Sequence, residues 1–203
     1  MIRITILYED RCGEGQIREF GPHALVQQCV CDAIGKEPWA LKREIILHGI
    51  PKNGATKLRN ECRSDRPKFG RDGSHVIAVY DDDRIRDFVK VGAPGCKEQV
   101  KHVLRAESRL GDKLQIVLLE RNLETVVATI CECDPAIAPP EVQDNALRRK
   151  KLFDRDIVLK NAAAPTAERR RLRDQLLTRV PSLGYLVNKI VALYRHHDVS
   201  GGL

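Results

Sequence analysis

The feature that most constrains the fold is an uninterrupted apolar run followed by three acids. Residues 76–80 are apolar or aromatic and lead directly into Asp81, Asp82 and Asp83. A short apolar run bounded by a turn and by charge is typical of a parallel strand covered on both faces. The pattern therefore predicts a buried strand with carboxylates at its carboxyl end, the edge at which open α/β sheets bind ligands.

These acids favour a metal site. Side chains two residues apart on an extended chain point the same way, so Asp81 and Asp83 can converge on one cation while Asp82 turns away. Like charges this close repel each other unless a positive ion lies between them. We expect Mg²⁺ or Mn²⁺, because hard divalent ions take oxygen ligands and need only one or two protein carboxylates.

Two further predicted strands also end in acids. Residues 2–8 are rich in β-branched side chains and run into Glu9 and Asp10. Residues 114–119 run into Glu120 and Arg121. Because the carboxyl ends of parallel strands meet at one edge of a sheet, these acids are expected near those that follow residue 80.

Helical patterns alternate with the strands. Glu124 opens a helix that follows residue 119, and a fourth strand is predicted at 43–48. The other helices are predicted at 23–34, 53–63 and 97–107. Strand and helix in alternation indicate an α/β fold with a mostly parallel sheet, right-handed crossovers and helices on its faces.

The order of the acids resembles a known family. A glutamate after the first strand, then an apolar strand ending in Asp-x-Asp, resembles the Toprim domain of topoisomerases, primases, small ribonucleases and the overcoming-lysogenization-defect nucleases. The strand at 114–119 and the acid after it resemble small stand-alone Toprim-like proteins that accompany ABC-type ATPases in phage-defence operons. The resemblance covers residues 1–134 and departs from the family at one point, where the usual Glu-Gly is Glu9-Asp10.

The resemblance implies a Toprim-like catalytic domain over residues 1–134 that hydrolyses phosphodiesters with Mg²⁺ or Mn²⁺. Asp81 and Asp83 would bind the metal, and Glu9 would complete the site or act as general base. A second ion would be held by Glu124, with Glu120 as the alternative.

Other charged groups are expected around this site. Asp82 and Asp10 would lie behind the metal ligands or near the phosphate. Lys52, Lys57 and Arg121 lie on segments that border the same edge, where a cation would stabilise phosphoryl charge. The residues alone do not choose among the three cations.

The resemblance also implies partners and a role. The chain would be a nuclease, a hydrolase of DNA or of structured RNA such as transfer RNA, and the effector of an antiviral defence system with a separately encoded ABC-type ATPase. The main alternative is a Toprim-like subunit that binds such an ATPase and has lost catalysis, which the Glu9-Asp10 departure favours slightly. A third is phosphotransfer on a small molecule, although no lysine follows the strand at 114–119.

Beyond Asp134 the pattern changes to helix and loop. Pro135, Pro139 and Pro140 interrupt it, and helices are predicted at 145–153, 166–179 and 183–194. We therefore divide the chain into the domain at 1–134 and a helical extension at 135–203. The last helix carries an apolar stripe that either packs on the chain's own sheet or docks onto a partner, such as the ATPase or a second copy.

Charge and cysteine content narrow the protein class. The net charge is +7, with basic runs at 148–151 and at 169–173 that are either solvated helix faces or phosphate contacts. Aromatic residues are 4% of the chain, which favours contacts to a nucleic-acid backbone over base stacking. Seven cysteines, an odd number, favour reduced thiols. The chain shows no apolar run of about 18 residues and no signal peptide, so we expect a cytoplasmic protein without a membrane span.

Zinc and ATP chemistry are not expected. Cys29 with Cys31, and Cys131 with Cys133, fall on predicted helices, where residues two apart face away from each other and cannot share a tetrahedral ion. The chain also lacks the Gly-x-x-x-x-Gly-Lys motif that cradles ATP phosphates.

Overall fold

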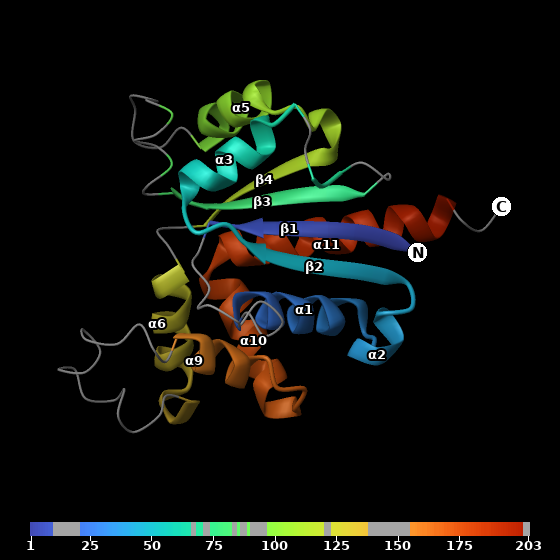
Figure 1. The fold of residues 1–203 in the computed structure, drawn as a ribbon. Helices are drawn as coiled ribbons and strands as arrows, with labels where there is room; N and C mark the ends of the chain where they lie inside the picture. Colours follow the sequence, from blue (N-terminus) through green and yellow to red (C-terminus); the bar gives the residue numbers. More distant parts are fainter. Residues whose placement is uncertain are drawn as a thin grey trace.

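The protein is an α/β fold built on a parallel sheet (Figure 1). The computed structural model describes residues 1–9, 21–65, 68–70, 74–82, 85, 89, 97–119, 123–137 and 155–200. Within these residues four strands pair in the order β2-β1-β3-β4. Their bounds are β1 (Ile2–Tyr8), β2 (Ile45–Pro51), β3 (His75–Asp81) and β4 (Leu114–Leu119). The predicted α/β class and parallel sheet are confirmed.

Helices cover both faces of the sheet (Figure 1). One face carries α3 (Ala55–Arg63) and α5 (Lys97–Glu107). The other face carries α1 (Gly21–Ile34), α6 (Leu123–Cys133), α9 (Arg155–Ala162), α10 (Ala167–Arg179) and α11 (Pro181–Ser200). Shorter pieces are α2 (Pro38–Leu41) and the 3₁₀ turns Gly111–Lys113 and Pro135–Ile137. The sheet is therefore the middle of three layers.

Both faces of β3 are buried, as the apolar run predicts. Ile77 and Val79 belong to the larger core, which lies under α1 and α11, whereas Ala78 and Tyr80 belong to the smaller core under α3 and α5. A strand enclosed by two cores has no solvent-facing side, which is why its sequence is continuously apolar and not alternating.

The C-terminal helices pack back on the chain's own sheet. The apolar stripe of α11, which includes Leu186, Val187, Ile190 and Val191, is buried in the same cluster as Ile4 of β1. Between the two alternatives for this stripe, the structure supports packing on the sheet. The free energy from burying it therefore stabilises the fold of residues 1–134.

Polar contacts fasten these helices as well. Arg173 of α10 is 1% exposed, and its Nε donates to Asp32 Oδ2 of α1 at 2.6 Å. At the far end of α11, Tyr194 donates a hydrogen bond to Glu44, whose carboxylate also binds Lys36 Nζ at 2.6 Å. These contacts join segments more than a hundred residues apart, so the last two helices are part of the main fold.

Some predicted boundaries were wrong. The strand predicted at 43–48 runs instead from Ile45 to Pro51, and α2 and α9 were not predicted. The helix predicted at 145–153 lies outside the described residues. In the parts of the chain that are described, no helix is both long and apolar enough to cross a membrane.

Candidate functional site

Glu9 and Asp81 meet at the carboxyl ends of two neighbouring strands. The register places Tyr8 opposite Val79, so Glu9 follows β1 beside the last residues of β3. The Glu9 backbone NH donates to the Val79 carbonyl at 3.0 Å, and Glu9 Oε2 accepts a hydrogen bond from the Asp81 backbone NH at 2.9 Å. The two acids expected from separate motifs therefore lie within one hydrogen bond of each other.

Glu9 and Asp81 lie at the point where the strand order of the sheet reverses. From β1 the chain passes through α1 to β2 on one side, and β3 and β4 then lie on the other side. The helices that follow β1 and β3 accordingly cover opposite faces (Figure 1). Loops diverge at such a point, and open α/β sheets bind their ligands in the crevice that this leaves.

Both acids are buried. Glu9 is 4% exposed and Asp81 is 7% exposed. Among the polar atoms of the described residues, Glu9 Oε1 and Asp81 Oδ1 are enclosed without a hydrogen-bond donor. Acids are seldom buried so fully unless they are paired or coordinate a metal, since removing a carboxylate from water is costly.

Tyr80 lies directly before Asp81 and is not a candidate base. Burial is the largest cause that raises the pKa of its hydroxyl far above the usual value, and the neighbouring Cys62 and Glu9 raise it further. The hydroxyl therefore stays protonated at physiological pH.

The turn between β2 and α3 closes the site on the other side of β1. Lys52 donates its backbone NH to the Tyr8 carbonyl at 2.8 Å, and Gly54 donates to the Glu9 carbonyl at 2.6 Å. Asn53 and Gly54 both have positive φ, 58° and 122°, and the second value suits glycine alone. The turn thus places the positive end of the α3 dipole next to Glu9.

Of the two candidate lysines, Lys52 is held at this edge and Lys57 is not. Lys52 Nζ lies 3.0 Å from Glu61 Oε2 and 4.7 Å from the centre of the Phe69 ring. Lys57 is exposed on α3. Lys52, whose backbone is paired with β1 and whose ammonium group is held in place, is the better placed of the two to meet a phosphate at this edge.

Asp82 points toward a lysine that sequence reasoning missed. Its Oδ2 lies 3.9 Å from Nζ of Lys97, the first residue of α5, and its residue exposure is 8%. Asp82 is thus turned to a partner other than Glu9. The sequence does place a lysine, Lys97, at the start of the predicted helix 97–107, and from this position the contact could have been predicted.

Glu124 lies at the first turn of α6 and pairs with another helix. Its Oε1 is 3.6 Å from Nη1 of Arg155, and its side chain is 53% exposed. Because the carboxylate is half exposed and the distance is long, this ion pair contributes little free energy. The structure therefore brings Glu9 and Asp81 together but directs Glu124 toward α9.

Four predicted site residues, Asp10, Asp83, Glu120 and Arg121, lie outside the described residues. In the ranges that the structure does describe, no three His, Cys, Asp or Glu side chains form a group that could hold a metal ion. Mg²⁺ commonly takes one or two protein carboxylates and completes its shell with water and phosphate. Two carboxylates, those of Glu9 and Asp81, would supply this number of protein ligands.

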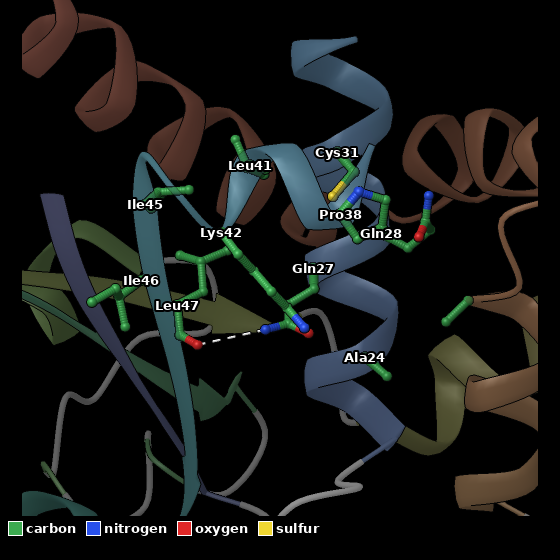
Figure 2. Close-up of a pocket in the computed structure, with 11 residues that line it drawn as sticks. Ala24, Gln27, Gln28, Cys31, Pro38, Leu41, Lys42, Ile45, Ile46 and Leu47 are labelled. Carbon is green, nitrogen blue, oxygen red and sulfur yellow. Dashed lines mark hydrogen bonds between the residues drawn. The ribbon is translucent and has the colours of Figure 1, made fainter. Parts of the chain in front are cut away.

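A separate pocket lies at the amino end of β2, away from the acidic edge (Figure 2). It has a volume of about 510 Å³ and is lined by α1, α2, the start of β2 and Ala163. Gln27, Gln28 and Lys42 are its polar side chains, and Gln27 Nε2 contacts the Leu47 carbonyl at 3.5 Å. None of the predicted site residues lines this pocket.

Two arginines of the run at 169–173 are held in ion pairs, and Cys29 and Cys62 are buried. Arg173 is buried against Asp32, and Arg169 pairs with Asp134, so neither is a solvated phosphate contact; residues 148–151 lie outside the described ranges. Burial raises the pKa of Cys29 to about 12 and that of Cys62 to about 11, which makes both thiols poor nucleophiles.

Comparisons with protein-family models, with curated proteins and with solved structures found no match for this chain.

Proposed function

We propose that the protein is a Mg²⁺- or Mn²⁺-dependent nuclease of Toprim type. The observation that carries the proposal is the hydrogen bond from the Asp81 backbone NH to the Glu9 carboxylate, which joins two buried acids at the ends of adjacent strands, at the switch point of a parallel sheet. Buried acids at a ligand-binding edge favour a cation, and a bound cation attracts the phosphates of a nucleic acid.

In this proposal Glu9 and Asp81 hold the ion together with Asp83, and Glu124 or Glu120 holds a second one. When bound, the ion supplies positive charge for the phosphate and lowers the pKa of a water molecule. Glu9 is fixed by its hydrogen bond to the Asp81 backbone, so one carboxylate oxygen orients the strand end while the other would ligate the ion.

Lys52 has a supporting role. Its ammonium group is held by Glu61 and by the Phe69 ring, and its backbone is tied to β1. A cation fixed in this way can stabilise negative charge on a phosphate without first having to be ordered. Glu124 reaches a second ion only by exchanging its contact with Arg155, which its exposure permits.

The wider role is also part of the proposal. The chain would act on DNA or structured RNA in the cytoplasm as the effector of a defence system, with a separately encoded ABC-type ATPase as partner. The net charge of +7 supports a polyanionic substrate, since the long-range field of the protein then attracts it.

The test is cleavage of labelled DNA and RNA in Mg²⁺ and in Mn²⁺ by wild type and by Glu9→Gln, Asp81→Asn and Asp82→Asn. We expect the first two variants to lose at least about a hundredfold in rate, because each removes a charge from the ion site. Asp82→Asn is the matched control, since its side chain faces Lys97 and should leave most of the activity. Equal activity of all four proteins would contradict the proposal.

A second candidate is a Toprim-like subunit that binds the ATPase without catalysis. The observation that favours it is the same hydrogen bond, because Glu9 would then have a purely structural task as acceptor for the end of β3. Under this alternative no nucleic acid is cut in either metal, alone or with the ATPase, while the complex still forms.

A further inference from the structure

Outside the acidic edge, the described surface has one exposed aromatic ring that two lysines share. Tyr185 of α11 is 39% exposed. Lys101 Nζ lies 5.2 Å from the centre of its ring, and Lys189 Nζ lies 5.3 Å from the same centre. Two ammonium groups repel each other, so their convergence on one ring marks a place where an anion would be stabilised.

The three side chains come from helices on opposite faces of the sheet. Lys101 belongs to α5, and Tyr185 and Lys189 lie one turn apart on α11. Both helices pack against β4, and the side chains meet beside this strand. The ring and the ammonium groups are therefore held by two packed helices and not by a loop.

The same surface reaches the acidic site. Lys97 lies one turn before Lys101 on α5, so the two share a helix face. Lys97 Nζ is 3.9 Å from Asp82, which directly follows Asp81. We call Lys97, Lys101, Tyr185 and Lys189 the lysine–tyrosine patch; its first lysine contacts the residue that follows Asp81.

One acid moderates the charge of this patch. Glu98 is 78% exposed and accepts a hydrogen bond from Lys101 Nζ at 2.7 Å. The pair lies three residues apart on α5, and its carboxylate is open to solvent whereas the Lys101 side chain is 13% exposed, so a phosphate competes with Glu98 for the ammonium group from the solvent side. The patch therefore has cations for a nucleic-acid backbone and an aromatic ring for a base.

We propose that the lysine–tyrosine patch binds a single-stranded segment of nucleic acid as it leaves the acidic site, with the lysines on phosphates and Tyr185 stacked on a base. This inference rests on the proposed nuclease function and specifies the path of its substrate. The low aromatic content favours contacts to the nucleic-acid backbone over base stacking; in this proposal one aromatic ring, that of Tyr185, adds stacking to the backbone contacts.

The test is binding of fluorescein-labelled oligothymidylate and oligouridylate, followed by fluorescence anisotropy in EDTA so that no cleavage occurs. Tyr185→Ala should weaken binding about tenfold, whereas Tyr185→Phe keeps the ring and should bind like wild type. The double variant Lys101→Gln/Lys189→Gln should lower the slope of log K against log salt by about 0.7 per lysine removed.

Two further variants act as controls. Glu98→Gln should strengthen binding, because it frees Lys101 from its carboxylate. The double variant Lys42→Gln/Arg43→Gln removes two exposed charges beside the start of β2 and should leave the salt slope unchanged. Thermal unfolding of each variant verifies that the fold is retained.

The outcomes separate this proposal from the nuclease proposal. Wild-type binding that is unaffected by the Tyr185→Ala and double-lysine variants overturns the patch, even where Asp81→Asn abolishes cleavage. No binding by wild type overturns it as well. Loss of binding in the patch variants together with no cleavage in any metal supports the patch and contradicts the nuclease.

Discussion

His23 makes the stability of the fold dependent on pH. It lies on α1, with Nε2 3.3 Å from the Leu47 carbonyl and Nδ1 3.3 Å from the Tyr8 hydroxyl. Burial lowers its pKa from 6.5 to about 4; the Leu47 carbonyl raises the pKa and His48 lowers it. The ring is therefore neutral in the folded protein at physiological pH.

The sign of the effect follows from this depressed pKa. The unfolded chain takes up the proton near 6.5, whereas the folded protein resists it until about 4, so acid favours unfolding. The contribution of neutral His23 to the free energy of unfolding is complete above pH 6.5 and falls as the pH drops toward 4. From about pH 7.5 to about pH 5, the two pKa values give a loss of about 2 kcal/mol in the free energy of unfolding.

Urea denaturation of wild type and His23→Gln at both pH values measures this loss. Glutamine keeps an amide donor for the Leu47 carbonyl but does not titrate, so the variant should lose about 2 kcal/mol less than wild type. His75, whose pKa is also lowered, chiefly by burial, is present in both proteins and cancels in the comparison. An equal loss in both proteins would refute the reasoning.

The remaining predictions concern packing and caps. Gly49→Ala would place a Cβ 2.2 Å from Cγ of His23, so we expect a loss of about 2 kcal/mol in a thermal melt; an unchanged melting temperature would contradict the packing. Arg173→Met leaves the carboxylate of Asp32 without its ion-pair partner and should cost about 3 kcal/mol in urea; a cost near zero would argue against the buried pair. Thr166→Ala removes the side-chain cap of α10 and should cost about 1 kcal/mol by the same method, whereas Thr166→Ser should cost much less.

The parts of the fold that depend on local pattern were predictable. The helix at 97–107 and the strand at 114–119 match the structure at both ends, because apolar period and flanking polar residues mark them. The strand at 43–48 was misplaced because Gly49 and Pro51 are typical strand breakers. This strand nevertheless needs a glycine at position 49, because the ring of His23 occupies the space that a Cβ atom would fill.

The candidate site was predictable only where strand order decides it. Glu9 follows β1 and Asp81 ends β3, the strand that pairs with β1, and a hydrogen bond joins the two residues. The contact of Glu124 with Arg155 depends on how α9 docks on α6, which no local pattern specifies. Likewise, the run of arginines at 169–173 does not reveal that Arg173 alone is enclosed.

The most direct test of the central claim is a crystal soaked in Mn²⁺ and measured for anomalous scattering. The account predicts a peak at ligand distance from a carboxylate oxygen of Glu9 or Asp81, and its absence in a crystal of the Asp81→Asn variant soaked in the same way. A wild-type crystal with no peak at these two carboxylates, or a peak that survives Asp81→Asn unchanged, would contradict the claim that this strand edge is a metal site.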